Sequence, residues 1–209
     1  MMDSPDTVYD ELKGKTQEEI RKVIRSLKRD INQLKREMEQ GDEDLFDPGR
    51  DVRISQTREA LEYAIKAYEE AGGTYEYTKA EQKSREFDLA LEGISKLNFY
   101  IGGFFGGYEM RTCTVSGDQV TMVVIHSLVN NEPDQDIQIK KENFIIGLKR
   151  IHLGEWKKRY LKQFVLDGTQ WDLEIQFADG RKPVRFSGSN AYPYNFNELL
   201  QLLEVYEQY

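Results

Sequence analysis

The feature that most constrains this 209-residue chain is a change in the spacing of its apolar residues near Gly93. Before that point apolar side chains recur every three or four residues, as on one face of a helix, and from Ile94 on they alternate, as in strands. The change predicts an α+β protein with a charged helical arm at residues 1–92 and an α+β domain at residues 93–209.

The arm is expected to be an antiparallel, coiled-coil-like helical hairpin. Thr16 and Glu19 form a capping-box pattern that starts a helix running to about Gln40, and a second helix runs from near Ser55 to Gly72. The hairpin is stabilised either by docking on the rest of the chain or by pairing with a second copy, which would make a homodimer. The predicted seam consists of Leu27, Ile31 and Leu34 facing Leu61, Ile65 and Tyr68.

The domain is expected to hold a mainly antiparallel five-stranded sheet in the order βββαββα, with helices on one face. Alternation predicts strands at residues 94–102, 109–115, 119–128, 169–177 and 182–188. We interpret Asn130–Asp136 as a polar loop and Lys140–Lys162 as a helix. Trp171 should be a core residue packed near Leu200 or Leu203, and Asn195 or Asn197 should cap the last helix.

Composition narrows the classes of function. The only cysteine, Cys113, permits no intrachain disulfide and no thiolate metal cage, and we expect no cofactor. No apolar run is long enough to cross a membrane and no signal-peptide pattern is present, so we expect a cytoplasmic protein that does not contact membranes. Acids outnumber bases 23 to 16 over residues 1–93 and 14 to 13 after them, which favours partners with basic protein surfaces over nucleic acid.

The residues proposed to bind a partner are carboxylates near the end of the first helix, together with phenylalanines as apolar anchors. The competing interpretation makes the acidic stretch only a solvated turn between helices, kept acidic for solubility. The glycine-rich run Gly102–Gly107 is expected to be a bend between strands, since it lacks the lysine and hydroxyl of a phosphate-binding loop. The residues proposed to bind a partner protein are Glu37, Glu39, Asp42, Glu43, Asp44, Phe46, Asp47, Phe104 and Phe105.

An alternative function is nucleic-acid binding or regulation by the basic segment Lys140–Lys162, where Trp156 and Tyr160 could stack on bases. The competing interpretation is a helix with an apolar core face and a solvated basic face. A second alternative is an enzyme of unknown reaction type, for which His126 and His152 offer little material. The candidate nucleic-acid contacts are Lys149, Arg150, Lys157, Lys158 and Arg159.

Three motifs carry a resemblance to a known family: GGFFGGY from Gly102, DGTQW from Asp167 and GSNAYP from Gly188. Over residues 94–204 the chain resembles an uncharacterised family of small proteins from gut Firmicutes. That resemblance implies an accessory protein of phages or conjugative elements. Together with the acidic arm, it leads us to expect a non-enzymatic protein-binding module, an inhibitor of a host defence nuclease that acts like an anti-CRISPR or anti-restriction protein.

Overall fold

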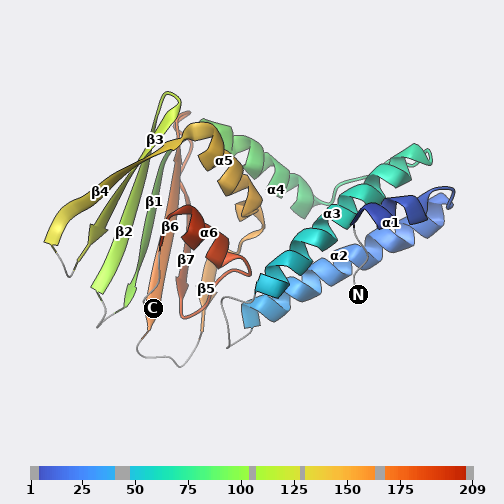
Figure 1. Ribbon diagram of the computed structural model, residues 1–209, viewed down its shortest axis with the longest axis horizontal. Coiled ribbons are helices and arrows are strands. Elements are labelled where there is room, and N and C mark those ends of the chain that lie inside the picture. Colours follow the sequence, from blue (N-terminus) through green and yellow to red (C-terminus); the bar gives the residue numbers. More distant parts are fainter. Residues whose placement is uncertain (1–4, 41–47, 104–106, 128–129, 163–167, 206–209) are drawn as a thin grey trace. The chain divides into compact units, whose positions relative to one another are not determined.

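A computed structural model of the protein describes residues 5–40, 48–103, 107–127, 130–162 and 168–205 (Figure 1). The chain divides into two compact units, Met1–Thr78 and Lys79–Tyr209. The division therefore lies before residue 79, whereas we had placed it after residue 92. None of the described helices is long and apolar enough to cross a membrane.

The described residues of the first unit form three helices, α1 (Pro5–Leu12), α2 (Gln17–Gln40) and α3 (Pro48–Glu70). At the start of α2 the Thr16 backbone N–H and hydroxyl both donate to the Glu19 carboxylate, at 2.8 and 2.6 Å, so the predicted capping box is formed. Both α1 and α2 pack against α3. The expected hairpin is thus supplemented by α1, a helix that we did not predict.

Helices α2 and α3 are antiparallel, but their register differs from the predicted seam. Gln17 Nε2 donates to Ala71 O at 2.8 Å, and the Arg21 guanidinium donates to the Tyr68 hydroxyl. Tyr68 therefore lies against the first turns of α2 and not opposite Leu27 or the residues after it. The buried centre of this unit consists of Leu12, Ile20, Ile24, Ala64, Ala67 and Tyr68, with Leu27, Leu61 and Ile65 packed against it.

The second unit is a seven-stranded mixed sheet with helices packed on it, so the α+β prediction is confirmed and the five-stranded topology is wrong. The spatial order is β4-β3-β2-β1-β6-β7-β5, and all neighbours are antiparallel except β5 and β7. The strands are β1 (Ile94–Gly103), β2 (Gly107–Ser116), β3 (Gln119–His126), β4 (Asn130–Lys140), β5 (Arg159–Leu161), β6 (Thr169–Phe177) and β7 (Val184–Ser189).

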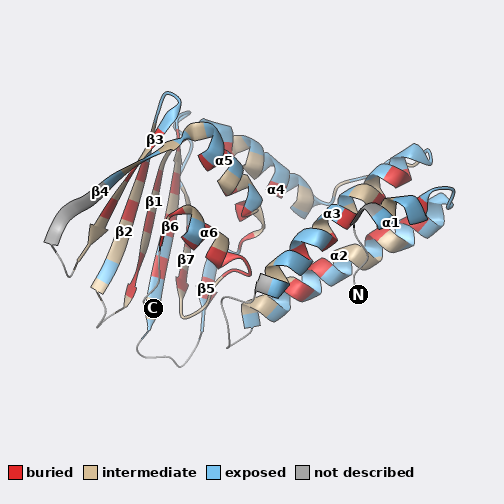
Figure 2. Ribbon diagram, viewed as in Figure 1, coloured by how far each residue is buried: buried red, intermediate tan, exposed pale blue. Residues whose placement is uncertain are grey.

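Three helices of this unit, α4 (Lys79–Ala90), α5 (Lys141–Arg150) and α6 (Phe196–Leu202), cover one face of the sheet. Figure 1 shows α5 and α6 side by side over that face, and Phe87 of α4 contacts the rings of Phe177 and Phe186 there. We call this the inner face. In Figure 2 buried residues alternate along the central strands, as expected for a sheet with one covered side.

The prediction that Trp171 is a core residue is confirmed, because its side chain is fully buried on the inner face. Its ring centroid lies 4.8 Å from that of Phe196 on α6, and 6.0 and 5.9 Å from those of Trp156 and Tyr160. The ring contacts therefore come from the first residue of α6, one to two turns before the expected Leu200 or Leu203.

Two additional strands explain the error in topology. The segment predicted as a polar loop is part of the edge strand β4, which tolerates polar residues because it pairs on one side only, with β3. The predicted helix at 140–162 ends at Arg150 as α5, and after a short 3-10 turn (Leu153–Glu155) the chain forms β5. His152 has a left-handed φ of 51°, which interrupts the helical path.

Candidate functional site

Most of the predicted acidic interface falls outside the described residues. Only Glu37 and Glu39 can be placed, at the end of α2, where exposed Glu37 accepts a hydrogen bond from Gln33 Nε2 at 2.8 Å. Gly103 and Gly107, the described residues on either side of 104–106, pair between β1 and β2, as expected for a connection between strands. The remaining members, Asp42, Glu43, Asp44, Phe46, Asp47, Phe104 and Phe105, lie outside the described residues.

The predicted basic surface is not one helix face. Lys149 lies on α5 and forms an ion pair with Glu92, while Arg150 ends that helix with an exposed side chain. Lys157 and Lys158 precede β5, and Arg159 is its first residue. Lys158 Nζ lies 4.4 Å from the Phe186 ring centroid, and burial there, together with nearby Lys83, lowers its pKa.

The aromatic residues expected to stack on bases belong to the core. Trp156 and Tyr160 are 6% and 5% exposed, and the Trp156 indole N–H donates to Asn195 Oδ1 at 2.9 Å. Asn195 also donates to Ile151 O, so its side chain joins the segment after α5 to the start of α6 and does not cap α6 as predicted. A base would have to displace packed side chains to reach either ring.

The DGTQW and GSNAYP motifs meet at one end of the β6–β7 pair. A Cβ on Gly188 would lie 2.1 Å from the indole nitrogen of Trp171, and a Cβ on Gly168 would lie 1.8 Å from the side chain of Asn190. The Trp171 indole N–H donates to Ala191 O at 3.0 Å, and Asn190 N–H donates to Thr169 O at 2.9 Å. The described parts of both motifs thus hold the strand ends together through packing and backbone hydrogen bonds, which gives them a structural role.

The residues considered for catalysis do not assemble into one site. Cys113 is buried in β2, and that burial raises the pKa of its thiol to about 12. His126 Nδ1 lies 3.4 Å from Glu109 Oε1, whereas His152 sits after α5. Across the part of the chain that the structure describes, no three His, Cys, Asp or Glu side chains gather as a metal ion would require.

Sequence reasoning missed a buried arginine on the inner face. The Arg111 side chain is 4% exposed, donates from Nε to Leu203 O at 2.6 Å and from Nη2 to Glu204 O at 3.0 Å, and forms an ion pair with Glu109. Arg111 thereby holds the carbonyls at the C-terminal end of α6. The available signal was a charged residue at an inward position of an alternating strand, two residues before Cys113.

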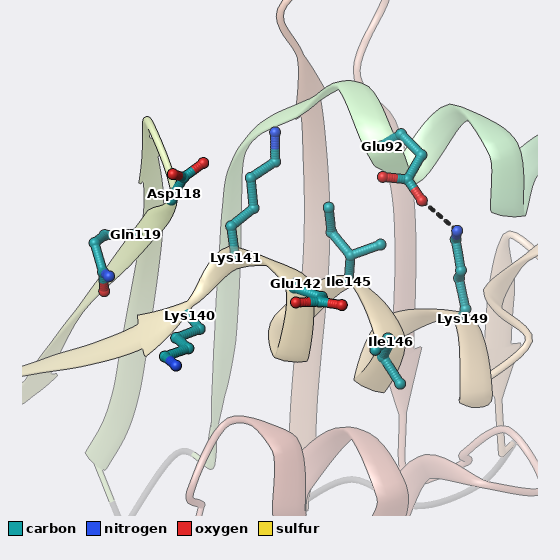
Figure 3. A pocket seen from close by; sticks show the side chains of 9 residues that line it. All are labelled: Glu92, Asp118, Gln119, Lys140, Lys141, Glu142, Ile145, Ile146 and Lys149. Carbon is teal, nitrogen blue, oxygen red and sulfur yellow. Dashed lines mark hydrogen bonds and ion pairs between the residues drawn. The ribbon is translucent and has the colours of Figure 1, made fainter.

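A groove of about 660 Å³ lies between the β2–β3 turn, the start of α5 and the turn that follows α4 (Figure 3). It has mixed charge, with three lysines and three acids, and its Lys149–Glu92 ion pair joins two walls. Ile146 is the exposed apolar residue of the groove at 42%. The lining residues are Glu92, Asp118, Gln119, Lys140, Lys141, Glu142, Ile145, Ile146 and Lys149.

A second missed feature lies on the opposite, outer face of the sheet. Cross-strand pairing sets Tyr100, Met110 and Ile125 in one row across β1, β2 and β3, because directly opposed residues share a face. Tyr108 is 38% exposed and opposes Gly102, which has no side chain to cover it, and its ring centroid lies 5.3 Å from that of Tyr100. We call Tyr100, Tyr108, Met110, Val123 and Ile125 the outer-face patch.

Acidic side chains flank the outer-face patch on both sides. Tyr100 is opposed by Asp172 of β6, and Val123 is opposed by Asp136 of β4. Burial raises the pKa of Asp172, while Arg185 has a smaller lowering effect. The helices α4, α5 and α6 pack on the inner face, so they do not cover the outer-face patch. The resulting surface is apolar and aromatic at its centre and acidic at its edges.

Comparisons with protein-family models, with curated proteins and with solved structures find no match to this chain. The resemblance over residues 94–204 therefore stays a prediction.

Proposed function

We propose that the protein is a non-enzymatic protein-binding module, and that the outer-face patch is its contact surface. The observation that carries this proposal is exposed Tyr108 paired with half-buried Tyr100, beside Met110, on a sheet face that no helix of its unit covers. Tyrosine and methionine are enriched at protein interfaces, and tyrosine buries a large area at small cost in conformational entropy.

The charge around the patch supports a partner with a basic surface. Asp172 and Asp136 flank the patch, and the whole chain has a formal net charge of -8. Opposite charge at the edge of an interface accelerates association and disfavours acidic partners. The acidic residues Glu37 and Glu39 on α2 belong to the same proposal as a source of long-range attraction.

The more specific proposal is an inhibitor of a host defence nuclease, encoded by a phage or mobile element. Such an enzyme has a basic groove for nucleic acid, and an acidic protein that occupies the groove would block cleavage. The buried state of Trp156 and Tyr160 supports protein binding over stacking on bases by the chain itself.

Site-specific photo-crosslinking tests the contact surface. A photoreactive phenylalanine replaces Tyr108 in cells that contain the protein, and a matched variant carries it at Thr114, on the same strand and face but outside the patch. We expect a discrete crosslinked partner from position 108 only. Equal capture from both positions would remove the outer-face patch from the function. Capture of nucleic acid in place of a protein would reject the protein-binding role.

A cleavage assay then tests the inhibitor role. If the captured partner is a nuclease, wild-type protein should suppress its cleavage of DNA or RNA, and the Tyr100→Ser variant should not. Cleavage that wild-type protein leaves unchanged would reject the inhibitor role and retain the binding module.

A further inference from the structure

We propose that the outer-face patch recognises an arginine side chain of its protein partner, held over the Tyr100–Tyr108 ring pair and against the Asp172 carboxylate. This inference rests on the proposed function and adds the chemistry of the partner.

The pairing of β1 with β6 brings the recognising groups together. Tyr100 and Asp172 are directly opposed in the antiparallel ladder, which places their Cβ atoms about 4.5–5.5 Å apart on the same face. On the other side of Tyr100, the Tyr108 ring lies at a centroid distance of 5.3 Å with an interplanar angle of 31°. The two rings and the carboxylate thus form a continuous aromatic and anionic surface.

This combination suits a guanidinium group better than an ammonium group. A guanidinium is planar, stacks on an aromatic face and donates two parallel N–H bonds to one carboxylate. An ammonium is a compact, strongly hydrated charge that loses more solvation when it docks on a ring. The apolar side chains of Met110 and Ile125, in the same row, would contact the residues that surround the arginine in the partner.

The charged neighbours of Asp172 leave room for an external cation. Burial raises the pKa of Asp172, and the positive charge of Arg185 has a smaller lowering effect. The Arg185 guanidinium, however, forms an ion pair with Glu174, the next outward residue of β6. The residue directly opposite Asp172 on β7 is Ser187, and the outward residue of β1 beyond Tyr100 is Asn98, opposite Glu174. Lys96 lies two residues further along β1. Burial that raises the pKa of Asp172 is consistent with a carboxylate whose charge a docked cation would stabilise.

Blocked tripeptides test the inference on the full chain. The probes are Ac-Ile-Arg-Trp-amide, the lysine analogue and the citrulline analogue, which keeps the shape of arginine without its charge. Binding is followed by NMR signals of tyrosine rings and methionine methyl groups. We expect saturable shifts at Tyr100, Tyr108 and Met110 with the arginine peptide, and about three- to thirtyfold weaker binding of the citrulline peptide.

Two isosteric variants separate the specific contact from general charge. Asp172→Asn should reduce the preference for arginine over citrulline to near one, whereas the matched control Asp136→Asn, on the same face, should keep it. Tyr100→Leu, which retains an apolar side chain on the strand, should also weaken the arginine peptide. An arginine preference that survives Asp172→Asn would overturn the inference, and so would shifts that map away from the patch.

The failure of this inference is distinguishable from failure of the proposed function. Crosslinking at position 108 with no arginine preference would leave the binding surface in place and reject arginine as the recognised group. If position 108 gives no crosslinked partner and the peptides give no response, both the proposed function and the arginine inference are rejected.

Discussion

Replacing Arg111 by methionine tests whether a buried charge network fixes the end of α6 to the sheet. In the wild-type protein the guanidinium, 4% exposed, contacts the carbonyls of Leu203 and Glu204 and the carboxylate of Glu109. Methionine fills a similar volume but takes the guanidinium away from the Glu109 carboxylate. That carboxylate is 16% exposed, and His126 Nδ1 lies 3.4 Å from it. Removing one partner of a buried ion pair costs about 3–5 kcal/mol, a large part of the roughly 5–15 kcal/mol of a typical domain.

A second variant distinguishes the cost of the stranded charge from the loss of packing. Glu109→Leu in the Arg111→Met background removes the carboxylate that has lost its arginine partner, so we expect the double variant to regain at least about 1 kcal/mol relative to the single variant. Urea unfolding followed by tryptophan fluorescence is suited to this question, because the two tryptophans, Trp156 and Trp171, both lie in the second unit. A loss below about 1 kcal/mol for Arg111→Met, or a double variant no more stable than the single one, would refute the reasoning.

Three further changes test other parts of the structure. Gly188→Ala should cost about 1–3 kcal/mol in the same urea assay, because its Cβ would overlap the Trp171 indole; an unchanged midpoint would contradict that packing. The raised pKa of Cys113 predicts that stability falls as pH rises from about 9 to about 12, since only the unfolded thiol ionises there; a Cys113→Ala variant should lack this component, and equal pH profiles would contradict it. Leu34→Asp should reduce the helical circular dichroism of the first unit, because Leu34 is 5% exposed on α2, and an unaltered signal would place it outside the helix interface.

The elements that could be predicted are those whose pattern is local. The capping box at Thr16 and the length of α2 follow from side-chain chemistry within a few residues, and the burial of Trp171 follows from strict alternation along β6. The register of α2 against α3 could not be predicted in the same way. Several registers place apolar residues together, and contacts such as Arg21 with Tyr68, 47 residues apart, select one of them.

The errors in the sheet arise from tertiary context. Tyr160 stands at a helix-like interval from Trp156, yet both are buried by contacts with β6, β7 and α6, which no spacing within the segment encodes. β4 is polar at its outward positions because it is an edge strand, and from the sequence such a segment is indistinguishable from a loop.

The candidate site illustrates the same limit. Tyr100 and Asp172 are 72 positions apart, and only the pairing of β1 with β6 makes them neighbours. The alternation of β1–β3 did contain a usable signal, because Tyr100, Met110 and Ile125 are apolar at positions that face away from the core. The acidic stretch that composition suggested as a partner surface is described only at Glu37 and Glu39, so its role stays a prediction.

The central claim is that the outer-face patch binds a protein partner, and the affinity of that partner for patch variants tests it most directly. Calorimetric titration would compare wild-type protein with the Tyr100→Ser, Tyr108→Ser double variant and with a Thr114→Ser control on the same face. Removing two aromatic anchors at the centre of an interface costs about 2 kcal/mol or more each, about 4 kcal/mol together, so we predict affinity at least about 700-fold weaker for the double variant and unchanged for the control. An affinity within about twofold of wild type, in a double variant with an intact fold, would contradict the account.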